Sequence, residues 1–201
     1  MKQITGYHFT DLLLRDGRPL PRPNEWLKHK GDVVVCQQGL HASEHPYDAL
    51  QYAPGKYLHK VVLRGDLESN GIPVDKWAGR ERKIIATIDA ELLLSDYVLW
   101  LYPEVWKEWT KSGGPLSTNV AVALIFAGRN SDQAVAARRL AASVSLSFNH
   151  AFRKRVRAKF ARAVRAAFAA QTKTAAEVRK PRGCPERTRT SNIHQKRKRA
   201  T

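Results

Sequence analysis

The chain has 201 residues, enough for one folded domain with an appendage, and it carries 35 Lys and Arg residues against 18 Asp and Glu residues. The charge is unevenly divided: residues 1–110 contain 14 basic and 15 acidic residues, whereas residues 111–201 contain 21 and 3. No apolar run approaches the roughly 18 residues of a membrane helix, and two distant cysteines exclude a disulfide framework. We therefore expect a near-neutral folded body followed by a basic region that binds an anionic partner.

Two β-branched runs predict strands in the first half of the chain. Val33–Cys36 ends at a glycine turn, and Leu58–Leu63 also precedes a glycine. Between them, residues 43–52 predict a short helix that begins at Ser43 or His45 and ends before a Pro-Gly pair. The resulting unit of strand, turn, helix and strand brings two histidines and a tyrosine to the lining of a pocket.

Helices are predicted for most of the second half. Residues 90–101 predict a largely buried helix capped by Asp89, and Pro103 starts another short helix. Residues 111–115 form a Gly-Pro boundary, and residues 118–127 predict a short apolar helix beyond it.

A much longer Ala-rich helix is predicted from Ser131 to Lys180, because this region contains no Gly or Pro. Apolar residues recur along it every four positions: Phe148, Phe152, Val156, Phe160, Val164 and Phe168. This spacing advances an α-helical stripe by about 40° per step, so the apolar face winds around the helix. Such a face wraps the body, pairs with another chain, or requires a break near Asn149–His150.

The same helix carries seven closely spaced cations, and no acidic residue lies between Asp132 and Glu177. The cations are Arg153, Lys154, Arg155, Arg157, Lys159, Arg162 and Arg165. Their density favours contact with the phosphates of nucleic acid, which gives salt-dependent binding without sequence preference. An anionic membrane or an acidic protein is the alternative partner for a basic amphipathic helix.

The last segment, from Pro181, is basic and lacks both periodicity and apolar residues, so we expect it to be disordered. These segments together predict an α+β protein in three parts. A small mixed β-sheet body with short helices occupies residues 1–112, a long Ala/Arg-rich helical arm occupies residues 116–180, and a disordered basic tail occupies residues 181–201.

One part of the body resembles a known enzyme family. Gly39–Ser43, Asp48–Tyr52 and the strand before Gly65 are similar to the nicotinamide-pocket segment of ADP-ribosyltransferases of the poly-ADP-ribose polymerase type. In that family a Gly-[Ile/Leu]-Tyr strand is followed by a Ser-Ala-x-x-Tyr helix and an apolar strand. The same stretch, with its GLHAS and ALQYAPG motifs, also resembles uncharacterised bacteriophage and prophage proteins.

The enzyme resemblance implies NAD as a cofactor and assigns roles to matching positions. Gly6–Thr10 resembles the family's first strand, and Glu81 stands where the catalytic glutamate opens a late strand. His41 replaces the tyrosine that stacks on nicotinamide, and it is the second catalytic candidate. The NAD-binding positions implied in this way are His8, Thr10, His41, Ser43 and Tyr52.

Other chemistry has weaker support. Cys36, His41, His45 and His59 are ligand types, but they lack the second ligand pair of a zinc site, so we expect no metal. Two functions remain for a protein that we expect in the cytoplasm. The first is an NAD-dependent ADP-ribosyltransferase-like body that a basic arm attaches to nucleic acid, and the second is a non-enzymatic nucleic-acid-binding or structural phage accessory protein. The sequence leaves the oligomeric state open.

Overall fold

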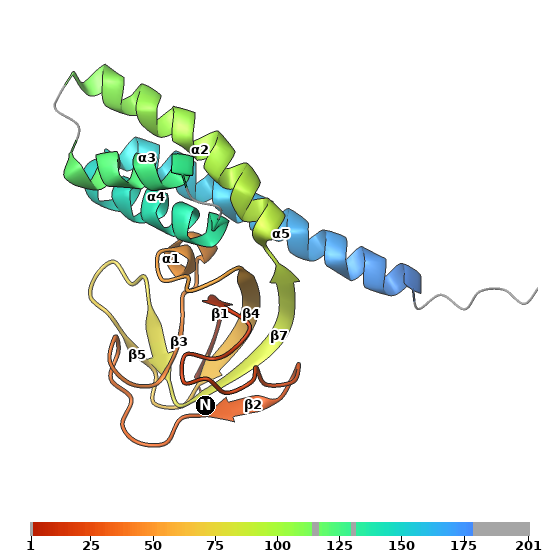
Figure 1. Ribbon diagram of the computed structural model, residues 1–201. Helices are drawn as coiled ribbons and strands as arrows, with labels where there is room; N and C mark the ends of the chain where they lie inside the picture. Colours follow the sequence, from red (N-terminus) through yellow and green to blue (C-terminus); the bar gives the residue numbers. More distant parts are fainter. Residues whose placement is uncertain (1, 114–116, 130–131, 179–201) are drawn as a thin grey trace, which may run out of the picture.

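Two small sheets form the lower half of the molecule in Figure 1, and the helices α2–α5 lie above them. The computed structural model describes residues 2–113, 117–129 and 132–178, so the predicted tail at residues 181–201 lies outside the described residues. The fold is α+β, as the sequence predicts. The described strands precede the long helices in the chain, and only the short helix α1 (Pro46–Leu50) lies between strands.

The strands pair in two groups. The first sheet has the order β1-β4-β7-β2, formed by β1 (Gln3–Thr10), β4 (Tyr57–Arg64), β7 (Glu81–Asp89) and β2 (Trp26–Lys28). The second has the order β3-β6-β5, formed by β3 (Leu40–Ala42), β6 (Trp77–Gly79) and β5 (Glu68–Ser69). All pairings between these strands are antiparallel, so the expectation of a mixed sheet is wrong. Parallel neighbours need crossover connections, and α2–α5 follow the strands instead of alternating with them.

A close backbone contact joins the two sheets. The backbone N–H of Tyr7 in β1 donates to the carbonyl of Ser43 at 2.7 Å, and the N–H of Ser43 donates back to Tyr7 at 3.0 Å. Gly6 permits this approach, because a Cβ at that position would lie 2.8 Å from the Ser43 carbonyl oxygen. The end of β3 is therefore held directly beside β1.

The alternation of side chains gives the first sheet two different faces. Val61, Leu63 and Ile84 lie on the face that packs against Ala42 of the second sheet. Phe9, Leu58 and Ile88 belong instead to the larger cluster that the helices complete. Side chains such as His8, His59 and Arg82 share the first of these faces, because they occupy the same alternating positions as the core residues between the sheets.

One predicted strand is absent. Val33–Cys36 forms a turn in which Val34 bridges Gln38, and Cys36 is exposed with a positive φ of 67°. Strand residues need a neighbour for their backbone hydrogen bonds, and the Val34 groups bond within their own turn. The β-branched run therefore has strand propensity but no partner.

The helices differ from expectation at two positions. The two predicted helices on either side of Pro103 are one helix, α2 (Glu91–Ser112), which ends at Gly113 in the left-handed conformation. Pro103 interrupts one backbone hydrogen bond, but Leu101 and Val105 are fully buried on either side of it and hold the helix together. The helix α3 (Thr118–Arg129) follows at the predicted place.

The predicted long helix is broken at Phe148–Asn149 into α4 (Gln133–Ser147) and α5 (His150–Val178). The Asn149 side chain accepts the N–H of Phe152 at 2.9 Å and caps the start of α5. The winding stripe of α5 then packs against the body: Val156, Phe160 and Val164 are fully buried.

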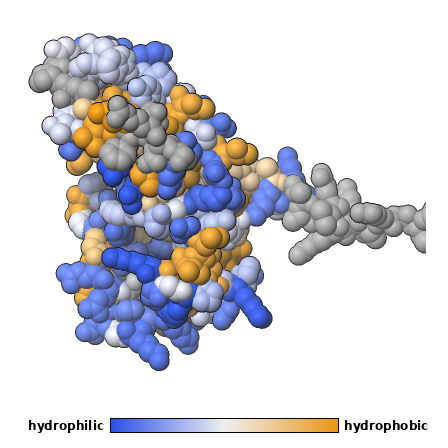
Figure 2. Space-filling view, viewed as in Figure 1, coloured by the Kyte–Doolittle hydropathy of each residue, from blue (hydrophilic) through white to orange (hydrophobic). Residues whose placement is uncertain are grey.

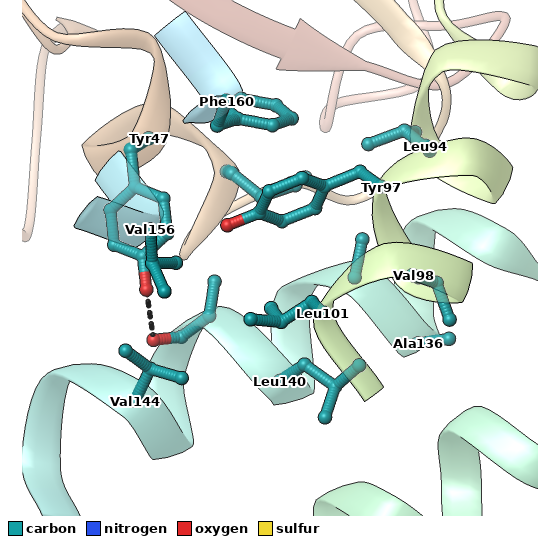
Figure 3. Close-up of a cluster of buried hydrophobic side chains, with 14 of the residues drawn as sticks. Tyr47, Leu94, Tyr97, Val98, Leu101, Ala136, Leu140, Val144, Val156 and Phe160 are labelled. Carbon is teal, nitrogen blue, oxygen red and sulfur yellow. Dashed lines mark hydrogen bonds between the residues drawn. The ribbon is translucent and has the colours of Figure 1, made fainter. Parts of the chain in front are cut away.

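The body and the helical arm share one core. Figure 3 shows Phe160 of α5 beside Tyr47 of α1 and Tyr97 of α2, with Leu140 and Val144 of α4 below them. The ring centroids of Tyr97 and Phe160 are 4.7 Å apart, and the Tyr47 hydroxyl donates to a carbonyl of α4 at 2.9 Å. The predicted division into a body at residues 1–112 and a separate arm at residues 116–180 therefore does not match the packing.

Apolar residues also reach the surface of the helices. Figure 2 shows hydrophilic residues over much of the sheet half on this face and hydrophobic residues gathered among the helices above. On α2, Leu92 and Leu99 are 81% and 71% exposed, and Trp106 is 47% exposed. Within the described residues, none of the helices combines the length and the apolar character that crossing a membrane requires.

Candidate functional site

Three histidines and an arginine lie near one another where the two sheets meet. His8 comes from β1, His41 from β3, His59 from β4 and Arg82 from β7. The pKa of His8 is well below its ordinary value, first because burial disfavours the charged ring and then because Arg82, His59 and His41 lie nearby. The structure thus brings His8 and His41 together, as the resemblance implies.

His59 is held rigidly and without charge. Its Nε2 lies 2.7 Å from the Thr10 hydroxyl, and its Nδ1 lies 2.8 Å from the Thr87 hydroxyl. Burial lowers its pKa to about 4, so the ring is neutral at pH 7, donating to one hydroxyl and accepting from the other. Thr10 is 3% exposed, and its hydroxyl already has this partner, which contradicts its assignment as a cofactor-binding residue.

His41 has an unused ring nitrogen. Its Nε2 is buried and has no hydrogen-bond partner among the described residues. Burial, followed by the charges of Lys76 and Arg82, lowers the pKa of His41 to about 4. His41 is therefore neutral at pH 7 and retains hydrogen-bonding capacity that the protein does not use.

Arg82 is the residue that sequence analysis missed. It is 5% exposed, and its Nη1 donates to the backbone carbonyl of His41 at 2.7 Å. No carboxylate pairs with it in the described part of the chain, and burial lowers its pKa to about 10. The available signal was its alternation with Ile84 in a strand, which assigns a charged side chain to a core-facing position.

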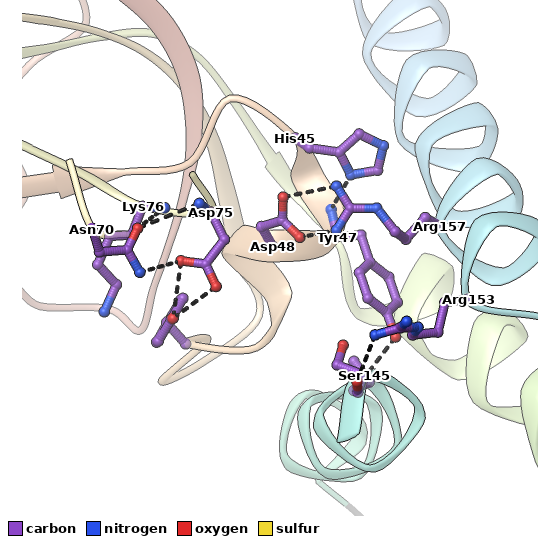
Figure 4. Close-up of polar contacts among 11 residues, drawn as sticks. His45, Tyr47, Asp48, Asn70, Asp75, Lys76, Ser145, Arg153 and Arg157 are labelled. Carbon is purple, nitrogen blue, oxygen red and sulfur yellow. Dashed lines mark hydrogen bonds and ion pairs between the residues drawn. The ribbon is translucent and has the colours of Figure 1, made fainter. Parts of the chain in front are cut away.

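Ser43 and Tyr52 lie at different depths. Ser43 is 2% exposed, and its backbone forms the bridge to β1, so its side chain is enclosed. Tyr52 is 43% exposed. The Tyr52 hydroxyl lies 3.3 Å from both carboxylate oxygens of Asp75, and the Lys76 ammonium lies 3.3 Å from the centroid of the Tyr52 ring. Figure 4 shows Asp75 and Lys76 beside Asn70, which holds this loop through its side chain. Ser43 is thus too enclosed to contact a cofactor, whereas Tyr52 lies at the open edge.

Glu81 is not part of this cluster. Its carboxylate accepts from Arg64 Nε at 2.6 Å and lies 3.3 Å from the Lys28 ammonium, and the Arg64 bond lowers its pKa. Alternation along β7 directs Glu81 to the face opposite Arg82. Its cross-strand neighbour on β4 pairs with Gln3, five positions from His8, which is roughly 16 Å along the strand. The assignment of Glu81 as the catalytic partner of His8 and His41 is therefore contradicted.

The neutral histidines predict acid sensitivity. Because the folded pKa values of His41 and His59 are about 4 and the ordinary value is 6.5, the unfolded chain binds more protons between these limits. The contribution of these histidines to the free energy of unfolding should be fully present above about pH 6.5 and should fall as the pH drops toward 4. His59 alone should account for a loss of about 2 kcal/mol between pH 7 and pH 5. Urea unfolding at pH 7 and at pH 5 measures this loss of free energy of unfolding. His59→Gln should make the loss smaller. An equal difference in the variant would contradict the prediction.

The seven predicted phosphate-contacting cations of α5 divide into two groups. Arg157 forms a bidentate ion pair with buried Asp48 of α1, with Nη2 2.9 Å from Oδ2, as Figure 4 shows. Arg153 donates to the carbonyl of Ser145 at 3.2 Å. The Arg157 side chain holds α5 against α1 and the Arg153 side chain holds it against α4, which contradicts their assignment to nucleic-acid binding.

The remaining cations face solvent. We define the outer face of α5 by its exposed basic residues Lys154, Arg155, Lys159, Arg162, Arg165 and Lys173. At 100° per residue these six positions fall within an arc of about 140°. Arg155 pairs with Glu104 at 3.0 Å and the Lys159 ammonium lies 5.4 Å from the Trp100 ring centroid, whereas Lys154, Arg162 and Arg165 have no such partner among the described residues.

Two hollows lie elsewhere on the surface. One of about 410 Å³ opens between the ends of α2, α3 and α4, and it is bordered by Trp109, Ser117 and Phe148. Another of about 260 Å³ lies between Gly55 and Asp132 at the start of α4. Neither is lined by His8, His41 or His59. No three His, Cys, Asp or Glu side chains in the described ranges are grouped so that they could hold a metal ion.

Comparison with known proteins yields one similarity. A family described as a domain of unknown function (DUF7666) matches residues 4–96, slightly less than half of the chain. The matched region covers both sheets and α1 and ends within α2. No curated protein and no solved structure matches the chain.

Proposed function

We propose that this protein binds nucleic acid without sequence preference through the outer face of α5. The observation that carries the proposal is the set of six exposed cations within one arc of the helix, on a segment that has no acidic residue from position 133 to position 176. The side chains of four of these cations, Lys154, Arg162, Arg165 and Lys173, have no ion-pair, hydrogen-bond or ring partner among the described residues. Such a surface neutralises successive phosphates, whereas base reading would require side chains fitted to base edges.

The salt dependence of binding tests the proposal. The variant Lys154→Gln/Arg162→Gln/Arg165→Gln removes three exposed charges that hold no other element in place. Anisotropy of a labelled duplex, titrated between about 0.05 and 0.2 M salt, should show a log-affinity slope that is lower by about 2.7 units than in the wild type. Unrelated duplexes should bind with similar affinity.

A matched control uses three exposed cations of the sheet half. Neutralising Arg22, Lys30 and Lys60 changes the net charge equally, but these residues lie outside the proposed interface. This control should leave the slope unchanged, as should a chain that ends at Lys180. Equal slopes in both triple variants would assign the binding to net charge, and loss of binding on removal of residues 181–201 would assign it to the tail. Either result would overturn the proposal.

As a second candidate, we propose that the region around His8 of β1 and His41 of β3 binds NAD, as expected for the ADP-ribosyltransferase resemblance. The proximity of His8 and His41 supports it, and the position of Glu81 argues against the family's catalytic mechanism. Glu81→Gln should therefore leave NAD binding and any nicotinamide release unchanged, whereas His41→Ala should weaken both. Calorimetry with NAD and chromatography of released nicotinamide measure these effects. Loss of nicotinamide release in Glu81→Gln would contradict the expectation, and absence of NAD binding would remove the candidate.

Either activity fits a protein that acts in the cytoplasm, which we propose as its location. The resemblance of the GLHAS and ALQYAPG motifs to phage and prophage proteins leads us to propose an infected or lysogenic host cell as the setting. An anionic membrane or an acidic protein is the alternative partner for the outer face of α5. Vesicles with anionic lipid, tested against the same triple variants, separate a membrane partner from nucleic acid.

A further inference from the structure

The outward side of α2 carries large apolar residues that the fold of a single chain leaves in solvent. Leu92, Leu99 and Trp106 are 81%, 71% and 47% exposed, and Tyr102 is 40% exposed. The opposite side of α2 already packs into the core, so this helix is apolar on two sides. In Figure 1, α2 runs along the upper edge of the molecule, above α3 and α4. A contiguous apolar surface of this kind marks an interaction site.

The spacing of these residues is that of a coiled coil. Leu92, Leu99 and Trp106 recur every seven residues, and Tyr102 follows Leu99 by three. A seven-residue step returns to within about 20° of the same direction on an α-helix, so the exposed apolar residues form a nearly straight line. We define the α2 stripe by positions a and d of this heptad repeat, all of them at least partly exposed: Leu92, Ser95, Leu99, Tyr102, Trp106 and Trp109. Such a stripe packs against another helix.

The α2 stripe is complementary to a second, antiparallel copy of itself. When two copies cross midway between positions 100 and 101, each a position of one helix faces a d position of the other. The facing pairs are Leu92–Trp109, Ser95–Trp106 and Leu99–Tyr102. The smallest side chain of the stripe thus lies opposite one of the two largest, which fills the space between the helices evenly. A parallel pair instead places each tryptophan against its own copy and leaves a gap at Ser95.

The charges beside the α2 stripe favour the same antiparallel crossing. Asp96 and Lys107 are exposed and lie on one flank of the stripe, about 60° and 80° from the direction of Leu99. In the crossing described, Asp96 of one copy and Lys107 of the other are offset by two residues, about 3 Å along the helix axis. Lys107 is 68% exposed and pairs with Glu104 of its own helix, an exposed contact that is readily exchanged. Two-fold symmetry forms the Asp96–Lys107 pair twice.

We propose that this protein forms a two-fold symmetric homodimer in which the α2 stripes of two copies pack antiparallel. Trp100 and Glu104, through which α2 contacts the outer face of α5, lie outside the stripe, so the dimer does not depend on nucleic-acid binding. The stripe spans about 26 Å, which is short for a coiled coil. Small interfaces give weak complexes, and we expect a dissociation constant of about 1–100 µM.

Sedimentation velocity of the full chain, at concentrations from about 0.1 to 500 µM, tests the dimer. The protein should be monomeric at the lowest concentration and dimeric at the highest. Leu99→Glu should weaken association at least tenfold, because it places two carboxylates near the centre of the interface. Leu146→Glu, at a leucine of α4 that is 75% exposed, should leave association unchanged. A monomer at the highest concentration, or equal association in the two variants, would overturn the proposal.

Disulfide cross-linking tests the antiparallel crossing in chains whose Cys36 and Cys184 are replaced by serine. An equimolar mixture of Ser95→Cys and Trp106→Cys chains should form a cross-linked dimer under mild oxidation. Ser95→Cys chains alone should remain uncross-linked, because the two copies of position 95 lie about 16 Å apart along the helix axes, too far for a disulfide. Cross-linking of Ser95→Cys with itself would indicate a parallel pair and contradict the proposal, as would a mixture that does not cross-link.

Discussion

A chain that ends at Ser112 should fail to fold, although it contains both sheets and all of α2. The core between α1, α2 and the first sheet is completed by six buried side chains from α4 and α5: Leu140, Val144, Phe152, Val156, Phe160 and Val164. Each contributes about 1.5–3 kcal/mol by burial, roughly 9–18 kcal/mol in total, whereas a whole domain is stable by only about 5–15 kcal/mol. Gel filtration and circular dichroism of residues 1–112 should reveal an aggregated or unfolded chain.

The control for this truncation is a chain ending at Lys180, which retains α5 and should unfold at the same temperature as the full protein. Phe160→Ala in the full chain tests the same contact without truncation and should lower the free energy of unfolding by about 3–5 kcal/mol. A soluble fragment of residues 1–112 with a cooperative thermal transition would show that the body folds independently. The predicted division into body and arm would then hold after all.

Arg157→Met should have the second large effect, because it leaves Asp48 buried without its cation. The Asp48 side chain is 4% exposed and that of Arg157 is 37% exposed. Removing one partner of a buried pair is strongly destabilising, and partial solvation of Arg157 reduces the expected loss to about 2–3 kcal/mol. Chemical denaturation measures the loss. The double variant Asp48→Leu/Arg157→Met should recover most of it, because no charge then remains buried.

The pH dependence of Arg157→Met gives an independent check. Burial already raises the pKa of Asp48 above 3.8, and removal of Arg157 raises it further. A group whose pKa is raised in the folded state loses its stabilising effect as the pH rises through that pKa. The deficit of the variant should therefore be smaller at about pH 5 than at about pH 7. A deficit that does not change with pH would mean that Asp48 gains solvent instead of a proton.

Local pattern was sufficient for several elements. Leu58–Leu63 lies within β4, and His45 caps α1 by accepting the N–H of Tyr47 at 3.2 Å. The winding stripe of α5 also follows from sequence, because a four-residue spacing drifts by about 40° per step on any α-helix. The sequence left three outcomes for that stripe, and the structure combines two of them: the helix breaks at Asn149 and the stripe wraps the body.

The candidate site was only partly predictable. Resemblance identified His8 and His41, and the structure brings them together at the junction of β1 and β3. It also selected Glu81, whose neighbour Arg82 is the residue that points between the sheets. A shift of one position along a strand reverses the face that a side chain occupies, so motif matching without register is uninformative there.

The sequence by itself determined the α+β class, the short helix after His41 and the basic, winding character of α5, because each of these depends on neighbouring residues and on the fixed geometry of a helix or strand. Only the tertiary structure decided which cations of α5 face solvent and which, like Arg157, pair with a residue more than one hundred positions away. It also decided that Arg82 is buried without a carboxylate. The physical reason is that pairing and burial depend on long-range contacts, which the alternation of residues along a chain does not specify.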